Sequence, residues 1–483
     1  MSTSADNVFS ELTPPGRGGI STLGLLGPDV CQALGRIFRG KHGGLPQPGQ
    51  LAYGHVVDQD GRTIDEVIVR GSSAARPDAQ TASWAGPDAG TASPRAAGAV
   101  EEMEIHCHGG PAAVLALAAR LEELGLRRLD WPDYLRRRAA LAGLSQVALE
   151  SELLLPHLAT LPTALVVIRQ RNGLLAEAVE RAEKLVAAGG VSAALGEIDA
   201  LLSAYEHVGR HIERQPRVAI LGAPNVGKSS LLNRLVGHER AIVTDLPGTT
   251  RDVVTETTDL VGLPVVLADT AGLPITGEGR RPADLAEQLG VERSRAEALQ
   301  ADVLLYLVDL SRPPSPDEQQ WVAGRPPTSV LVGAKADLSP FAGCHGCDVG
   351  SRDPSLQGTV AEPTFAKATA GRQRNRGTRA DLVEGGSFPV AVEVATSSLT
   401  GQGVDQLAER ILAALGFRWP AEDEAVPFTA RQATCLRAAR AALAAGDAQT
   451  AQLALSALVA PAHDAARLSR RAGIGASGPA QAG

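Results

Sequence analysis

Cysteine, methionine and aromatic residues are scarce in this chain of 483 residues. It contains 5 cysteines and 2 methionines, and 3% of its residues are Phe, Trp or Tyr. Five cysteines are too few for the disulfide framework that stabilises many small secreted proteins. We therefore expect a protein of a reducing compartment.

A long hydrophobic run and a secretory leader are both missing from the sequence. The most apolar stretch, Leu153 to Ile168, contains Pro156, His157 and Pro162 and is too short to span a bilayer. The N-terminus lacks the basic region followed by an apolar core that a signal peptide needs. We therefore expect a soluble, cytoplasmic protein with no membrane partner.

An excess of positive charge is missing as well. The chain has 46 Lys and Arg against 54 Asp and Glu, which gives a formal net charge of −8. This balance argues against a dedicated polyanion-binding protein and leaves open a local basic face. The contents of 44% hydrophobic and 21% charged residues are ordinary for globular proteins, and the length indicates about two to four domains.

The N-terminal region, residues 1–118, mixes short strands with a helix. The segments Thr63–Val69 and Glu102–His106 have strand character, and a helix is expected near Ala112 to Leu124. Residues 72–99 are rich in Ala, Ser, Pro and Gly without periodicity, which predicts a disordered insertion. The region as a whole therefore predicts an α+β domain.

Helical and α/β patterns occupy the rest of the chain. Residues 119–215 have helical spacing, and residues 417–483 are helical to about Ala472, so the two segments predict one helical domain. Residues 216–416 alternate apolar runs with amphipathic stretches, which indicates a doubly wound α/β domain inserted in the helical one. Residues 339–388 break the alternation and predict a long mobile insertion.

The segment Gly222–Ser229 has the spacing G-x-x-x-x-G-K-[ST] of a phosphate-binding loop. An apolar strand, Val218–Leu221, precedes it, and a helical stretch, Ser230–Leu235, follows it. In such a loop the backbone N–H groups surround the phosphates, while Lys228 reaches the β- and γ-phosphates and the Ser229 hydroxyl binds Mg²⁺. The alternative is a plain glycine-rich turn between strand and helix. The context favours a nucleotide-binding site.

Two further segments have the character of nucleotide-sensing loops. The Gly/Pro-marked loop Ile242–Asp252 offers adjacent Thr hydroxyls that can complete the Mg²⁺ shell, although such pairs are also common in ordinary strands and turns. Val265–Gly272 places an Asp at the end of an apolar strand, before a loop of small residues. We expect Asp269 to hold Mg²⁺ through water and the Gly272 N–H to sense the γ-phosphate.

A base-selecting motif follows another apolar strand. The carboxylate of Asp337 can accept from guanine N1–H and N2–H₂, and the stem of Lys335 can cover the ring. The usual first residue of this motif is Asn; here it is Ala334, and one missing hydrogen bond lowers guanine affinity roughly tenfold. Backbone groups at Ser397 and Ser398 would meet guanine O6. If Asp337 did not select the base, the alternative would be an ATP-dependent enzyme.

In this order and spacing, these motifs resemble a translation-factor-type GTPase domain. The segments with the most family-like residues are Pro224–Leu231, Val243–Asp252, Asp269–Leu273, Glu287–Arg293, Thr13–Gly19 and Glu104–Gly110. Together they resemble the tRNA modification GTPase MnmE (TrmE) family. The resemblance implies an α/β P-loop GTPase domain inserted in an all-α helical domain, preceded by an α+β N-terminal folate-binding-like domain.

The resemblance also implies a potassium-activated GTPase without an arginine finger, whose G domains dimerise across the nucleotide. The implied K⁺ ligands are Asn225, Thr244, Leu246 and Thr249. The implied Mg²⁺ ligands are Ser229, Thr250 and, through water, Asp269. The implied catalytic residues are Lys228 and Glu287, the latter orienting the attacking water unless it is a solvated helix-face carboxylate. The full GTP-binding set is Asn225, Val226, Gly227, Lys228, Ser229, Ser230, Thr244, Thr249, Thr250, Asp269, Thr270, Ala271, Gly272, Lys335, Asp337, Ser397 and Ser398.

The family resemblance suggests two functions for the chain. The first is modification of the tRNA wobble uridine by a homodimer, together with the FAD-containing partner MnmG and a one-carbon unit from 5-formyltetrahydrofolate. The family's folate-contacting residues fall on or near Gly24, Val100 and Leu144, and the segment Gly475–Gly483 lacks the family's Cys-x-Gly-Lys tail. These departures favour the second hypothesis, a GTP-gated RNA- or ribosome-associated binding protein that has lost the modification chemistry. The full-length domain order favours the first, which is our main expectation.

Overall fold

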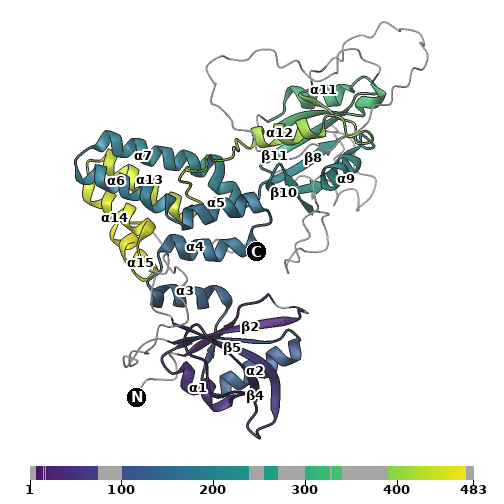
Figure 1. Cartoon of the computed structure of the whole chain (residues 1–483). Coiled ribbons are helices and arrows are strands. Elements are labelled where there is room, and N and C mark those ends of the chain that lie inside the picture. Colours follow the sequence, from purple (N-terminus) through teal and green to yellow (C-terminus); the bar gives the residue numbers. More distant parts are fainter. Residues whose placement is uncertain are drawn as a thin grey trace, which may run out of the picture. The chain divides into compact units, whose positions relative to one another are not determined.

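The computed structural model describes residues 7–14, 16, 18–73, 101–238, 255–269, 300–326, 329–339, 390 and 392–474. The chain forms two compact units, which Figure 1 shows with the elements labelled. The first unit comprises residues 1–158, 164–213 and 420–483, and the second comprises residues 159–163 and 214–419. The second unit therefore interrupts the first along the sequence.

A seven-stranded sheet forms the N-terminal part of the first unit. Its strands are β1 (Val8–Glu11), β2 (Ile20–Gly27), β3 (Phe38–Gly40), β4 (Leu51–Val57), β5 (Thr63–Ser73), β6 (Glu101–His108) and β7 (Arg127–Arg128), in the order β3-β4-β5-β6-β2-β1-β7. All neighbours are antiparallel except β1 and β7. The predicted strands at 63–69 and 102–106 are confirmed within β5 and β6.

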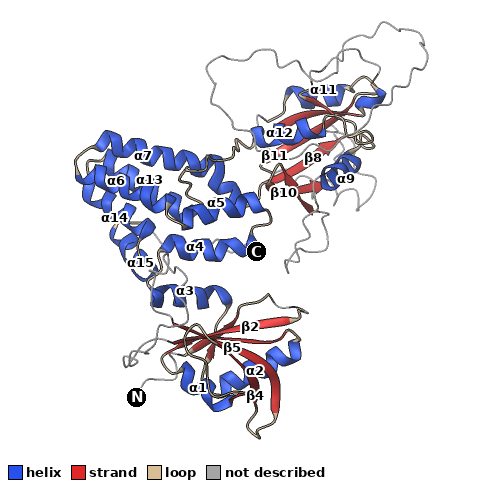
Figure 2. Cartoon of the chain, in the orientation of Figure 1, coloured by secondary structure: helices blue, strands red, loops and turns tan. Residues whose placement is uncertain are grey.

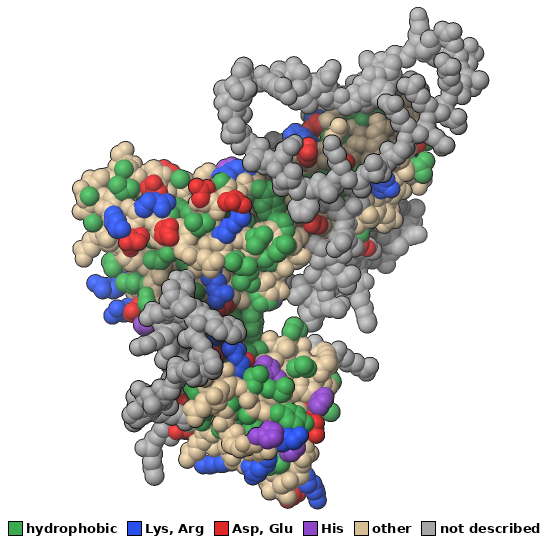
Figure 3. All heavy atoms as spheres, viewed as in Figure 1, with side chains coloured by type: hydrophobic (Ala, Val, Ile, Leu, Met, Phe, Trp, Pro, Cys, Tyr) green, Lys and Arg blue, Asp and Glu red, His purple; other side chains and the backbone are tan. Residues whose placement is uncertain are grey.

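Alternating side chains give strand β6 one apolar face. In β6, Met103, Ile105 and Cys107 are buried, while Glu104 and His106 between them are partly exposed. Two helices, α1 (Val30–Ile37) and α2 (Pro111–Glu123), supply the apolar residues that complete this core. Figure 3 shows several histidine side chains at the surface of this part of the chain. The period of two therefore places these β6 side chains in the core on one face of the sheet, while Val8 and Leu26 of β1 and β2 belong to a second apolar cluster with Tyr134.

The N-terminal core continues past the boundary predicted at residue 118. That residue lies inside α2, whose Leu117, Ala118 and Leu121 are all buried in the core of the sheet. The chain then adds the edge strand β7, which pairs with β1. Because α2 packs on the sheet and β7 pairs within it, this part of the unit extends to at least Arg128.

The two predicted insertions lie almost entirely outside the described residues. Only the first two residues of segment 72–99 are described, and they belong to β5, which stays paired with β6 up to Ser73. Of segment 339–388 the structure describes Ser339 alone. The disorder predicted for residues 72 and 73 is therefore wrong, because strand pairing overrides their loop-like composition.

The remainder of the first unit is built from helices. They are α3 (Trp131–Ala142), α4 (Gln146–Leu154), α5 (Leu161–Arg171), α6 (Leu174–Ala187), α7 (Val191–Ala204), α8 (Arg210–Glu213), α13 (Ala430–Ala444), α14 (Ala448–Val459) and α15 (Ala462–Arg471). The first residues of α5, up to Thr163, belong to the second unit. Side chains that cap helix N-termini by accepting a backbone N–H are Asp130, Ser145, Thr429 and Asp447. The C-terminal helices α13 and α14 pack on α7 and α6, so helices far apart in sequence share one core (Figure 1).

The second unit contains a six-stranded sheet. Its strands are β8 (Arg217–Gly222), β9 (Thr255–Leu260), β10 (Leu263–Asp269), β11 (Val303–Asp309), β12 (Ser329–Ala334) and β13 (Val394–Ala395), in the order β13-β12-β11-β8-β10-β9. Only β9 is antiparallel to its neighbour. Among the described residues of this unit are the helices α9 (Lys228–His238), α11 (Pro316–Ala323) and α12 (Val404–Ala414), seen with the sheet in Figure 2.

The strands of this sheet match the apolar runs of the sequence. Residues 217–222 of β8 are almost all buried, as expected for a central strand covered on both faces. The helix α9 packs on β8, β9 and β10, while α12 packs on β12 and β13. No helix in the described part of the chain is long and apolar enough to cross a membrane.

Candidate functional site

The phosphate loop connects the central strand β8 to helix α9. Gly222 ends β8 with a φ of 153°, and Gly227 precedes the helix with a φ of 111°. Residues other than glycine rarely adopt the φ of Gly227. Asn225, at the mouth of the loop, also has a positive φ of 61° and an exposed side chain. A Cβ built at Gly227 would meet no atom within 4 Å, so open space lies beside the backbone there. The loop therefore has room for an anion next to its N–H groups.

Lys228 folds back over this loop. Its Nζ donates to the carbonyl oxygens of Gly222 and Ala223, each at 3.0 Å. The residue is 8% exposed, whereas Ser229 and Ser230 on the next positions of α9 are exposed. The ammonium group is thus held at the loop by two neutral acceptors, which phosphate oxygens can replace with charge-assisted hydrogen bonds.

The predicted base-binding segment follows β12. Lys335 has φ of 59°, and the next residues form the short 3-10 helix η5 (Ala336–Leu338), which contains the exposed Asp337. The N–H of Ala336 donates to the carbonyl oxygen of Thr396 at 3.0 Å, so the chain after β12 is tied to the chain after β13. This hydrogen bond brings Asp337 and the segment at Ser397 into one region.

Ser397 and Ser398 differ in what they can offer a ligand. Ser397 is fully buried, and its Oγ accepts from the N–H of Thr400 at 3.2 Å. Ser398 is partly exposed. Ser397 thus stabilises the turn at Thr400, and the adjacent backbone is the part that can face a base.

The sheet topology gathers these segments at one edge. The strands β8, β10, β11, β12 and β13 are parallel, so the loops that follow them leave from the same edge. The phosphate loop follows β8, and Asp269 is the last residue of β10. The Lys335–Asp337 segment follows β12, and Ser397 lies two residues after β13. In an open parallel sheet, ligands usually bind in the crevice outside the carboxyl ends of the strands, at the point where the strand order reverses. Here that point lies beside β8, the first strand of this sheet in the sequence.

Several predicted site residues are not described. Outside the described residues lie Thr244, Leu246, Thr249, Thr250, Thr270, Ala271, Gly272 and Glu287. Asp269 is described as the last residue of β10, without its side chain. Val226 is buried below the loop and contributes packing to it.

Asp309, at the end of β11, is a site residue that our sequence analysis missed. Its Oδ2 accepts from Lys335 Nζ at 2.7 Å, and its Oδ1 accepts from the Ser311 hydroxyl at 2.6 Å. Burial acts to raise the pKa of Asp309, but these hydrogen bonds outweigh it and lower the pKa overall. The signal was an acidic residue ending the apolar run 303–308. Asp309 holds the Lys335 ammonium group and so positions the stem expected to cover the base.

Restoring the missing amide of the base motif tests this geometry. Ala334 is 5% exposed and pairs with Asp309 across the β11–β12 ladder. We expect Ala334→Asn to add one hydrogen bond and raise GTP affinity roughly five- to tenfold, with ATP affinity unchanged. Titration of fluorescent GTP and ATP analogues measures both, with the exposed Ala323→Asn as the matched control. An equal gain for ATP would contradict the assignment of this segment to guanine.

A family model and curated proteins match this chain. The model described as "50S ribosome-binding GTPase" matches residues 217–331. The tRNA modification GTPase MnmE of Roseiflexus sp. (strain RS-1) is 33% identical over 433 residues, covering 84% of this chain and 81% of that protein. The protein of the same name from Thermus thermophilus is 31% identical over 459 residues, covering 90% of this chain and 88% of that protein.

Solved structures show a weaker likeness. The G domain of the T. maritima FeoB iron transporter covers 41% of this chain and 98% of that chain, at 20% identity and a TM-score of 0.24. A likeness this weak supports no conclusion. The curated relatives, matched over most of both chains, show instead that the chain belongs to the tRNA modification GTPase MnmE family.

Proposed function

We propose that this GTPase is activated by potassium and modifies the wobble uridine of tRNA together with an FAD-containing partner of the MnmG kind. The observation that carries the proposal is the meeting of Gly222–Ser229 and Lys335–Asp337 at one edge of a parallel sheet. The first segment would bind the phosphates of a nucleotide and the second its guanine base. The names of the matched relatives support tRNA modification as the process served.

The residues of the phosphate loop fit a magnesium-bound nucleoside triphosphate. A bound Mg²⁺ would neutralise charge that develops on the β- and γ-phosphates. Ser229, Thr250 and a water on Asp269 would hold this ion. Lys228 would exchange its two carbonyl acceptors for phosphate oxygens, and the loop N–H groups would bind the same anion. The open space beside Gly227 supports this fit.

Potassium would take the place of an arginine finger. We assign Asn225, Thr244, Leu246 and Thr249 as its ligands, and Glu287 as the residue that orients the attacking water. The exposed side chain of Asn225, held at the loop mouth by a left-handed backbone, supports its role as a ligand. Dimerisation of the G domains across the nucleotide would complete the site. The proposed architecture is the GTPase domain inserted in the all-α domain, behind a folate-binding-like N-terminal domain.

A second candidate is a GTP-gated RNA- or ribosome-associated binding protein without the modification chemistry. The observation that favours it is the packing at Gly24, where the family has a folate-contacting Arg. A Cβ at Gly24 would lie 2.6 Å from the Tyr134 hydroxyl and 2.9 Å from Leu12, and Tyr134 is 1% exposed. Leu144, near the position of the family's Lys, packs against the same apolar cluster. This arrangement supports the loss of contacts to 5-formyltetrahydrofolate.

Hydrolysis in two salts tests the potassium proposal. We expect GTP turnover by the full chain to be about tenfold or more faster in KCl than in NaCl, since a fitting cation stabilises transition-state charge. Asn225→Ala should remove most of this difference, whereas the exposed Asn172→Ala should keep it. Equal turnover of the wild-type chain in both salts would refute potassium activation.

A further inference from the structure

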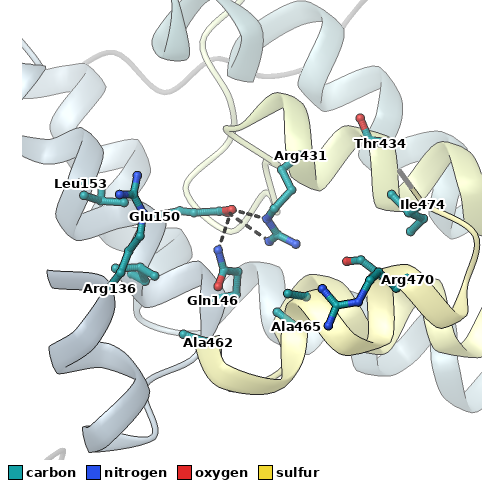
Figure 4. Close-up of a pocket in the computed structure, with 13 residues that line it drawn as sticks. Arg136, Gln146, Glu150, Leu153, Arg431, Thr434, Ala462, Ala465, Arg470 and Ile474 are labelled. Atoms are coloured by element: carbon teal, nitrogen blue, oxygen red, sulfur yellow. Dashed lines mark hydrogen bonds and ion pairs between the residues drawn. The ribbon is translucent and has the colours of Figure 1, made fainter. Parts of the chain in front are cut away.

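The helical part of the first unit contains a cavity of about 420 Å³. Helices α3, α4, α13 and α15 surround it, as Figure 4 shows. Part of its lining is apolar: α4 contributes Leu149 and Leu153, and α15 contributes Ala462, Ala465 and Ala466 at helical spacing. The small side chains of α15 keep the space between these helices open.

A buried ion pair forms the back of the cavity. Arg431 binds the Glu150 carboxylate with Nε and Nη2, and its remaining N–H groups donate to the carbonyl oxygens of Ala457 and Leu458 at 3.1 Å. Glu150 also accepts from Gln432 at 2.7 Å. Glu150 and Arg431 carry opposite charges and form their hydrogen bonds within the protein. They therefore stabilise the helices around the cavity and give it no net charge.

Two other arginines give the cavity its charge. Arg136 on α3 and Arg470 on α15 approach it from different sides (Figure 4). Arg470 forms no ion pair with any carboxylate that the structure describes, and Arg136 is half exposed and paired only with the exposed Asp133. Since Asp133 does not line the cavity, the cavity carries a net positive charge in a chain whose own net charge is −8.

More arginines continue this charge along α15. Arg467 and Arg471 lie one turn apart on that helix and are both exposed. Arg467 pairs with Asp464 at 3.1 Å, while Arg471 has no ion pair among the described residues. A row of exposed guanidinium groups beside an apolar hollow can bind phosphates and an unstacked base together.

We propose that the cavity between α3 and α15 binds an unpaired segment of RNA. Arg136 and Arg470 would contact phosphates, and the apolar lining would receive one splayed base. A paired duplex keeps its bases stacked and cannot fill the hollow, so a loop should bind better than a duplex of equal charge. The inference rests on the proposed function, in which tRNA is the substrate, and it assigns a surface to that RNA.

Binding of labelled RNA to the full chain tests this assignment. The probe is a stem–loop RNA with an unpaired loop, compared with a fully paired RNA of equal length. We expect the stem–loop to bind about tenfold more tightly. The double variant Arg136→Ala with Arg470→Ala should weaken stem–loop binding roughly tenfold. It should also make the slope of the logarithm of the binding constant against the logarithm of salt concentration shallower by about 1.4, the value for two phosphate contacts of a single strand. Ala466→Glu, at an exposed lining position, should weaken binding through a carboxylate in the hollow.

Matched arginines elsewhere on the helices serve as controls. Arg181 and Arg440 are 58% and 54% exposed and pair with Glu197 and Asp199, so Arg181→Ala with Arg440→Ala removes the same charge away from the cavity. Stem–loop binding that falls equally in both double variants, or in neither, would overturn the inference. GTP hydrolysis in KCl, measured on the same samples, would remain at the wild-type rate, so failure here is distinguishable from failure of the GTPase proposal.

Discussion

Replacing Lys228 by alanine is expected to lower GTP turnover by about 10²–10³-fold, the largest catalytic effect of any single change in the described residues. The side chain is buried at the phosphate loop, and its Nζ donates to two backbone carbonyl oxygens at 3.0 Å. A GTP-bound loop would have this ammonium group as its cation on the β- and γ-phosphates. Its removal therefore weakens both nucleotide binding and stabilisation of the transition state.

Turnover and binding are measured separately for this variant. Steady-state phosphate release gives turnover, and titration with a fluorescent GTP analogue gives affinity. Lys184→Ala is the matched control, because Lys184 is an exposed helix residue paired with Glu180. A turnover of Lys228→Ala within threefold of the wild type, with the fold intact by circular dichroism, would exclude the loop as the site of GTP hydrolysis.

Glu150→Ala is expected to destabilise the first unit by roughly 3–5 kcal/mol, because it leaves a buried guanidinium group without its partner. Arg431 has a side chain only 26% exposed, and Glu150 is 10% exposed. Burial acts to lower the pKa of Arg431, but the adjacent carboxylate outweighs it and raises the pKa overall. Glu150 also accepts hydrogen bonds from Gln432 and Thr429, so its loss removes a junction between α4 and α13.

The free energy of unfolding is measured by urea titration with helix content as the signal. The two units can unfold separately, so the helical transition is fitted on its own. Asp199→Ala breaks the exposed pair with Arg440, whose side chains are 54% and 50% exposed, and should cost less than about 1 kcal/mol. If Glu150→Ala cost no more than Asp199→Ala, the buried pair would not hold the helices together.

Local patterns explain how much of the fold could be predicted from the sequence. The apolar runs at 218–221 and 303–308 become central strands, because a strand covered on both faces needs apolar side chains at every position. The end of the N-terminal part was harder to place. Residue 118 lies in a helix whose core partners come from the preceding sheet, and composition does not report such packing.

Those parts of the site that depend on the spacing of nearby residues could be predicted from the sequence. Contacts between residues far apart in the sequence could not, because only folding brings them together. The phosphate loop and its helix follow from glycine and lysine positions, and α9 begins at Lys228. The pairing of Lys335 with Asp309 joins residues 26 positions apart through adjacent strands. The pair Glu150–Arg431 spans 281 positions, and only the packing of α4 and α13 brings it together.

The most direct test of the central claim is mass analysis of wobble uridines in tRNA. It compares a strain lacking this protein with the same strain complemented by the wild-type chain or by Lys228→Ala. We predict that the modification is lost in the deletion strain, restored by the wild-type chain and absent with Lys228→Ala. A normal modification profile in the deletion strain would contradict a role in tRNA modification and leave the GTP-gated binding protein as the function.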